Sequence, residues 1–320
     1  MKIVQSLLFL LVITYSASVW ALDAPVITAA AKGPNHINLT WSGVVDPGYG
    51  YKIEIQSAND SRYSSWTEIA TIPYWVTESH YKDPQDNTAS QYPVFSLRNN
   101  TSYNFRVRSY KGNTSSAYST YSNTAATTTR NYTAYYVNST TGIDNSTCGT
   151  STSPCRTISY AINTRDLATS GRVIIISGGS YANDYIRPIH SGSAGVDNKI
   201  VIMAEPGSTV NITSSSTIPI SLSYNYIVID GITVTSDYND NMVAVTGSYN
   251  AIANCEFDGS GNVSWGPWIG GSYNLVHGVY SHDFGSVADQ TGGSTMQIVG
   301  SATPANYNII QYSLFRRGGH

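Results

Sequence analysis

The chain has 320 residues, of which 41% are apolar and only 12% carry a charge, and its formal net charge is −3. This length and apolar content are enough for two domains, each with its own core. The weak charge balance argues against a nucleic-acid partner. Tyr (25 residues) and Gly (27) are abundant, which is typical of exported all-β proteins.

Residues 1–21 have the features of a signal peptide. Lys2 provides the positive start, Leu7 to Ile13 form a short apolar run, and Val19 and Ala21 occupy the positions before cleavage. This run is too short to span a bilayer, and no later segment is long and apolar enough to do so. The sequence therefore predicts a protein that is secreted or held at the cell surface, without a transmembrane segment.

Short segments of alternating apolar and polar residues follow, separated by turn residues. They lie at 36–41, 51–56, 66–72 and 103–110. Alternation with period two at this spacing predicts a β-sandwich, which we place at residues 22–130.

This segment resembles a fibronectin type III domain. Trp41 stands where that family has its core tryptophan, and Tyr51 stands at the start of the next strand. In SLRNNTSYNFRVRSY, Leu97 precedes Tyr103 by six residues, as in the family's tyrosine corner. The resemblance implies that the Tyr103 ring is buried, that its hydroxyl bonds a backbone group upstream, and that residues 116–123 form the last strand. A spacer or adhesive module is the expected role.

A Thr-rich run at 123–134 lacks apolar periodicity and is interpreted as a linker. In the second domain, placed at residues 131–320, Cys148 and Cys155 enclose a short polar segment. In an oxidising compartment they are expected to form a local disulfide. The spacing also permits a pair of metal ligands, although no His or further Cys lies nearby to complete a site.

The start of the second domain resembles the pectate-lyase-like superfamily of right-handed parallel β-helix proteins. The resemblance rests on YYVNSTTGIDNSTCGTSTSPCRTISYAI from Tyr135, and on SGSAGVDNKIVIMAEPG at 191–207. It implies a solenoid whose open end is capped by a short helix at about 156–168, because a terminal repeat otherwise exposes its core.

Internal repeats support the solenoid independently of that resemblance. Four segments align on a tyrosine, with offsets of 23, 24 and 34 residues, beginning at Tyr226, Tyr249, Tyr273 and Tyr307. Two columns of inward-facing residues are then predicted: Ile229, Ile252, Val276 and Ile310, and Ile232, Cys255, Val279 and Ser313. A second apolar strand precedes each segment. A leucine-rich repeat is excluded because no leucine scaffold is present.

The same register makes further predictions about these coils. The third offset implies a loop of about ten residues inserted within 283–295. Asn250, Asn274 and Asn308 follow three of the tyrosines and are expected to stack as a structural ladder in which the amides bond one another. Cys255 is expected to be a core residue and not a nucleophile.

Chemically useful residues fall one step past the last strand position. Thr235, Asp258, His282 and Arg316 form one predicted column, and Ser236, Gly259, Asp283 and Arg317 form the next. Uronate lyases must neutralise a sugar carboxylate and remove the adjacent proton. His282 is the candidate base, Arg316 or Arg317 is the candidate neutralising group, and Asp283 is an additional acid. The competing interpretation is a solvated turn with chance polar residues.

Ligand binding is predicted at neighbouring positions. Asp258, Trp265 and Trp268 are candidate substrate-binding residues, while Asp237 and Asp240 offer oxygen ligands for Ca²⁺. Residues 131–320 contain seven Lys and Arg against twelve Asp and Glu. A solenoid with this balance would need a bound cation to attract a polyanion.

The resemblance implies a carbohydrate-active protein, with β-elimination of an acidic extracellular polysaccharide as the leading hypothesis. The polygalacturonase type of hydrolase would require closely grouped Asp pairs, and none of its motifs is present. The alternative is a non-catalytic surface or adhesion protein that uses the solenoid as a binding or display scaffold. We expect a monomer with further coils beyond His320, because the chain ends inside a repeat.

Overall fold

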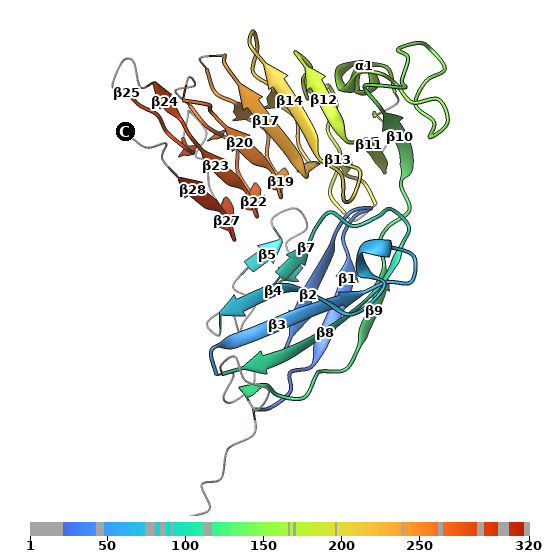
Figure 1. Cartoon of the computed structure of the whole chain (residues 1–320), viewed down its shortest axis with the longest axis vertical. Coiled ribbons are helices and arrows are strands. Elements are labelled where there is room, and N and C mark those ends of the chain that lie inside the picture. Colours follow the sequence, from blue (N-terminus) through green and yellow to red (C-terminus); the bar gives the residue numbers. More distant parts are fainter. Residues whose placement is uncertain are drawn as a thin grey trace, which may run out of the picture.

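The structure is a computed structural model in which a β-sandwich lies against one side of a parallel β-helix (Figure 1). It describes residues 22–42, 48–73, 81–83, 88–90, 92–111, 117–165, 167–168, 171–195, 197–238, 240–261, 265–286, 291–299 and 307–316. The predicted signal peptide lies outside the described residues. Within them, no helix has the length and apolar character needed to cross a membrane.

The sandwich consists of two antiparallel sheets. The first has the order β1-β2-β7 and the second the order β4-β3-β8-β9. Their strands are β1 (Ile27–Ala31), β2 (Ile37–Trp41), β3 (Gly50–Gln56), β4 (Thr67–Pro73), β7 (Tyr92–Val94), β8 (Ser102–Tyr110) and β9 (Ala125–Thr128). A 3-10 turn (Ser61–Tyr63) and a small hairpin, β5 (Tyr81–Asp83) with β6 (Thr88–Ser90), complete this half.

The tyrosine corner is present as expected. The Tyr103 side chain is buried, and its hydroxyl accepts a hydrogen bond from the backbone N–H of Arg98 at 2.9 Å. Trp41 packs beside Tyr51 in the same core, with ring centroids 5.3 Å apart. The expected last strand is confirmed only in part. The Ser119 and Ser122 N–H groups bond the backbone of β8, but the regular strand is β9, inside the run interpreted as a linker.

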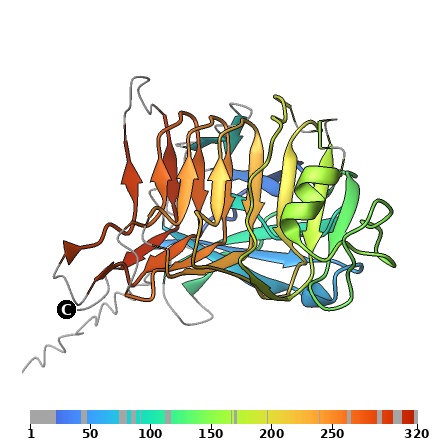
Figure 2. The same cartoon turned by 90° about the horizontal axis from the view of Figure 1, so that it is seen from above.

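The β-helix is built from three parallel sheets. We call the sheet that faces the sandwich the covered sheet; it contains β10 (Thr133–Val137), β11 (Arg172–Ile176), β13 (Ile200–Ala204), β16 (Ile227–Asp230), β19 (Ala251–Ala253), β22 (Leu275–His277) and β27 (Ile309–Gln311). The polar sheet contains β12 (Gly179–Ala182), β14 (Val210–Ser214), β17 (Ile232–Ser236), β20 (Glu256–Asp258), β23 (Tyr280–His282) and β28 (Leu314–Arg316). The third sheet contains β15 (Ile220–Leu222), β18 (Val243–Val245), β21 (Trp268–Ile269) and β26 (Gln297–Ile298). Figure 2 shows the coils stacked side by side, with the helix at one end.

The predicted coil register is confirmed. Ile229, Ile252, Val276 and Ile310 are successive partners across β16, β19, β22 and β27. The four aligned tyrosines stack with ring centroids 4.8 to 4.9 Å apart. This distance matches the spacing between hydrogen-bonded strands. Cys255 is buried in the core, and burial raises the pKa of its thiol to about 12, which fits the predicted structural role.

The asparagine ladder forms, but its bonds differ from the expectation. The Asn250 amide oxygen accepts from the Ile227 N–H, and its nitrogen donates to the Tyr224 carbonyl. Asn274 and Asn308 repeat this pattern one coil later each time. The side chains therefore bond the backbone of the preceding coil and not one another, because that backbone presents groups left unpaired at the turn.

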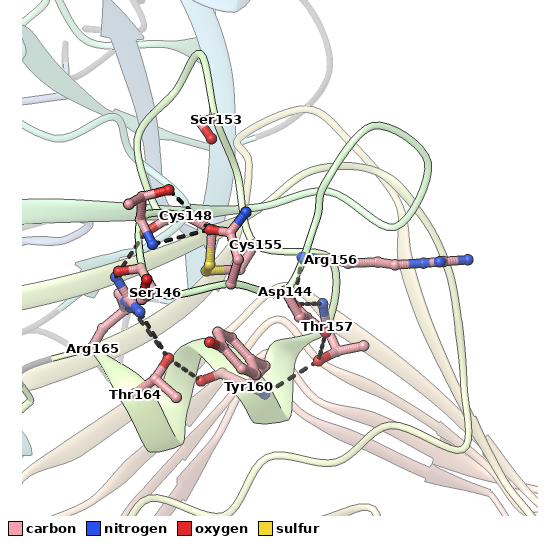
Figure 3. Close-up of a disulfide and its surroundings, with 12 residues drawn as sticks. Asp144, Ser146, Cys148, Ser153, Cys155, Arg156, Thr157, Tyr160, Thr164 and Arg165 are labelled. Atoms are coloured by element: carbon pink, nitrogen blue, oxygen red, sulfur yellow. Dashed lines mark hydrogen bonds between the residues drawn. A yellow bond between two sulfur atoms is a disulfide. The ribbon is translucent and has the colours of Figure 1, made fainter.

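The cap helix α1 spans Ile158–Thr164, so it is shorter than the predicted 156–168. Thr157 caps its start, while the Asp184 carboxylate accepts from the N–H groups of Ile158 and Ser159. The predicted disulfide between Cys148 and Cys155 is present in the loop that precedes the helix (Figure 3). From the C-terminal end of the helix, Arg165 donates to the Cys148 carbonyl at 2.8 Å and so joins the helix to this loop.

Two smaller elements belong to the predicted insertion. β24 (Gly285–Ser286) pairs with β25 (Thr291–Gly292) in an antiparallel hairpin between β23 and β26. The residues between these two strands lie outside the described part of the chain. The expected loop therefore leaves the solenoid at the end of β23, beside the residues singled out as a site.

Candidate functional site

The predicted site column lies on the outward face of the polar sheet. Asp258 pairs with Thr235 on one side and with His282 on the other, and His282 pairs in turn with Arg316. Residues alternate along these strands, so that Phe257 and Ser281 point into the core while their neighbours point outward. The repeat places an acid, an imidazole and a guanidinium on three successive coils.

The His282 imidazole is the centre of the cluster. Its Nδ1 lies 2.8 Å from the Asp283 Oδ2 and 4.0 Å from the Asp258 Oδ1, while its Nε2 lies 3.2 Å from the Glu256 Oε1. The ring stacks on Tyr280 at a centroid distance of 4.1 Å. Carboxylates thus approach both ring nitrogens, and the stacked tyrosine holds the ring plane.

The protonation of His282 follows from this environment. Burial lowers its pKa, but the hydrogen bonds to Asp283 and Glu256 and the charges of Asp258 and Asp283 outweigh burial, so its pKa is raised above 6.5. Once deprotonated, the imidazole is a stronger base than an unperturbed histidine. A proton on Nδ1 bound to Asp283 would leave Nε2 as the basic nitrogen.

Glu256 was missed by the sequence reasoning. It lies two residues before Asp258 on β20, so both side chains point outward from the same strand. The period-two rule could have identified it once the strand was assigned. Its side chain is 45% exposed, so the carboxylate faces both the imidazole and solvent.

The arginines are less well placed than the histidine. Arg316 is exposed on β28, and within the described residues no ion pair joins it to the cluster. Arg317 lies outside the described residues. Arg316 therefore borders the cluster from the next coil, where it is accessible to a bound anion.

The predicted metal ligands Asp237 and Asp240 differ in their surroundings from the carboxylates beside His282. Asp258, His282 and Asp283 each present one ligand atom, and these atoms all lie within 4.8 Å of one another. Asp237 and Asp240 do not belong to this group. Asp237 lines a pocket of about 260 Å³ one coil away, and Asp240 accepts from the N–H of Asn241. Among the described acidic residues, Asp258 and Asp283 thus lie close enough to share a cation. Binding of Ca²⁺ at Asp237 and Asp240 stays a prediction.

That pocket continues the site column toward the capped end of the solenoid. Its lining is rich in hydroxyl and amide groups: Asn183, Thr213, Ser214, Ser215, Thr235 and Asp237. Thr235 is the coil neighbour of Asp258. Uncharged hydrogen-bonding groups therefore lie directly beside the charged cluster.

The candidate substrate-binding tryptophans lie on and next to the third sheet. Trp268 is part of β21, and a Cβ added to Gly270 would lie 2.4 Å from its indole, so the six-membered part of the ring lies against that glycine. Trp265 is 42% exposed and forms bridges with Asn241 and Ser294 on the adjacent coils. The chain segment that joins them to Asp258 is partly outside the described residues.

Several solved structures are similar to about a third of the chain. Solved structures that resemble part of the chain include a human fibronectin type III domain-containing protein 3 domain (21% identity, 36% of this chain, 93% of that chain, TM-score 0.25) and a Clostridium thermocellum Fn3-like protein (19%, 33%, 91%, 0.22). A β-1,2-glucanase from Parabacteroides distasonis is 21% identical over 36% of this chain and 14% of its own, with a TM-score of 0.26. These likenesses carry no information about activity.

No curated protein matches the chain. A fibronectin type III domain and an internal disulfide fit an extracellular protein. Residues 23–125 match the family model of the fibronectin type III domain, which agrees with the sandwich and its tyrosine corner.

Proposed function

We propose that this protein is exported and cleaves an acidic extracellular polysaccharide by β-elimination at the His282 cluster. The observation that carries the proposal is the column of Asp258, His282 and Arg316 on successive coils, along the outward face of the polar sheet. A polymer lying along the coil axis would meet these three groups in sequence. The hydroxyl-lined pocket beside Thr235 supports the same direction of binding.

In this proposal His282 acts as the base. Asp283 holds the proton on Nδ1, and Nε2 removes the proton on the sugar carbon next to the carboxylate. The electrons of that C–H bond form the new carbon–carbon double bond, and the bond to the leaving glycosidic oxygen breaks. The imidazolium can return its proton to that oxygen, so that the site ends the cycle as it began. Glu256 stabilises the imidazolium in between.

The substrate carboxylate must be neutralised for its neighbouring C–H to become acidic. Arg316 lies on the adjacent coil, and its guanidinium is the group proposed to neutralise this carboxylate. Three carboxylates surround the imidazole, so a polyanion also needs a bound cation to overcome their repulsion. Ca²⁺ held by oxygen atoms of Asp258 and Asp283 would supply that positive charge.

The test uses the full-length protein with several uronate polymers, in the presence of Ca²⁺ or of a chelator. A lyase produces unsaturated uronates, which absorb in the ultraviolet. We expect absorbance to rise with Ca²⁺, and we expect His282→Ala and Arg316→Ala to abolish the rise while the protein stays folded. His190→Ala and Arg187→Ala, at exposed positions on the early coils, are the matched controls.

The alternative, a non-catalytic binding scaffold, predicts a different outcome. Polymers would then bind to the wild-type chain and to His282→Ala equally, with no absorbance for any of them. That result would rule out the lyase and leave the solenoid as a binding surface.

A further inference from the structure

The outward face of the covered sheet is apolar, in contrast to that of the polar sheet. Val228, Ala251 and Leu275 on successive strands point away from the solenoid core and are buried. On the polar sheet the corresponding outward positions are occupied by residues such as Thr233 and Glu256. An antiparallel or parallel sheet face of this apolar character is normally covered by another layer.

The sandwich is that layer. Phe95 lies in the loop before the tyrosine corner, and Tyr132 lies in the connection between the two halves. Both belong to the same buried hydrophobic cluster as the outward residues of the covered sheet. The Phe95 ring stacks on His36 at 4.6 Å and lies 5.4 Å from the His277 ring of β22. Tyr92 of β7 also packs edge-on against His277. The contact thus has its own aromatic core.

A buried carboxylate fixes the position of the two halves. Asp230, at the end of β16, is 1% exposed and accepts from the Ser96 N–H, the Ser96 hydroxyl and the Asn35 amide, each at 2.8 Å. Asn254 on the next coil adds a bond of 3.4 Å. A buried carboxylate is costly unless it is satisfied in this way. Three of its four bonds come from the sandwich.

The sandwich loop is shaped for this contact. Ser96 has φ 58°, a conformation that non-glycine residues rarely adopt, and it directs the N–H and the hydroxyl of one residue to a single carboxylate. Arg62 donates to the Ser96 carbonyl at 2.9 Å and to Asp60, which in turn accepts from the Tyr103 hydroxyl. A continuous hydrogen-bond chain therefore runs from the tyrosine corner to the solenoid.

We infer that the sandwich and the β-helix form one folding unit, in which the sandwich permanently covers the apolar face of the covered sheet and Ser96 with Asp230 sets their relative position. The sandwich is then part of the solenoid's structure, and not a spacer that moves independently of it. The covered sheet is then closed to any ligand, which leaves the polar sheet and the third sheet accessible. This inference does not depend on the proposed activity.

Segment-resolved hydrogen exchange of the full-length protein in increasing denaturant tests the inference. In the wild-type chain we expect strands β3 and β8 of the sandwich and strands β13 and β16 of the covered sheet to lose protection at one common denaturant concentration. Two separate concentrations would overturn the inference.

Variants at the contact sharpen the test. Ser96→Ala removes one hydrogen bond to a charged group, and we expect it to lower the common thermal midpoint by roughly 3–6 °C. Asp230→Ala leaves several buried donors unpaired, and it should lower the midpoint further. Ser180→Ala and Asp237→Asn, on exposed parts of the polar sheet side, should leave it unchanged. A shift confined to the sandwich strands in Ser96→Ala would contradict a single unit.

Discussion

Ser96 and Asp230 are 134 positions apart in the sequence, yet both the N–H and the hydroxyl of the serine bond the carboxylate of the aspartate at 2.8 Å. The carboxylate is buried without a cation among these contacts, and burial raises its pKa even though the donors lower it. The contact therefore depends on the complete donor set from both halves of the molecule. A histidine in the same contact between the sandwich and the covered sheet, His277, determines how the free energy of unfolding responds to pH.

His277 makes the contact between the sandwich and the covered sheet sensitive to acid. Burial, and to a smaller extent His36, lowers its pKa to about 3, and its Nδ1 has no hydrogen-bond partner among the described residues. Below pH 6.5 the unfolded chain takes up a proton that the folded chain refuses. The free energy of unfolding should therefore fall between pH 6.5 and 3, by at most about 5 kcal/mol.

Denaturant unfolding of the wild type and of His277→Phe across this pH range measures the effect. Phenylalanine fits an environment formed by Phe95, Tyr92 and Tyr312, so its stability should depend less on pH. Asp230, whose pKa is raised, contributes in the opposite direction in both proteins. His190→Gln, at an exposed position, is the control. Parallel pH curves for the wild type and His277→Phe would contradict the assignment.

The pKa of the His282 imidazole should lie above 6.5, whereas that of His277 lies below it. Asp283→Asn removes a hydrogen bond and a charge that raise the pKa, so we expect the imidazole of this variant to titrate at lower pH. NMR of the ring protons measures this directly, with Asp237→Asn as the control. If β-elimination is observed, its rate should rise with pH through the same pKa, because the base acts deprotonated. A rate that falls over that range would assign His282 as an acid.

The disulfide should stabilise the capped end of the solenoid. Cys148 and Cys155 are separated by seven positions. Closing a loop of this size is worth about 2–3 kcal/mol through the unfolded state. The double variant Cys148→Ser with Cys155→Ser should lose this amount in thermal or denaturant unfolding. Adding a reductant should destabilise the wild type similarly and leave the double variant unaffected.

The tyrosine stack should contribute measurably to stability. Tyr273 lies between two rings, at 4.8 Å from Tyr249 and 4.9 Å from Tyr307. Tyr273→Ala removes both contacts and should cost about 1–3 kcal/mol, whereas Tyr273→Phe keeps them and should cost little. Tyr224→Ala, at a position outside the stack with an exposed side chain, is the control for denaturant unfolding. Equal losses in the alanine and phenylalanine variants would show that stacking is not the source.

The coil architecture was predictable from the sequence because each coil repeats the same local pattern. Alignment on Tyr226 and its equivalents sets the register, and this register places His282 between Asp258 and Arg316, as the strand pairing confirms. The contact between Ser96 and Asp230 was not predictable, since a pairing between two different domains leaves no periodic trace. Similarly, the raised pKa of His282 depends on its hydrogen bonds to Asp283 and Glu256, whose distances do not follow from the repeat.

The longest offset between aligned tyrosines, 34 residues, leaves the stack undisturbed, because Tyr273 and Tyr307 are as close as the other pairs. The additional residues are accommodated at one edge, beyond β23, where they border the His282 cluster. This edge can therefore change in length during evolution without changing the coils. Insertions here provide a route by which the same scaffold could acquire new ligand preferences.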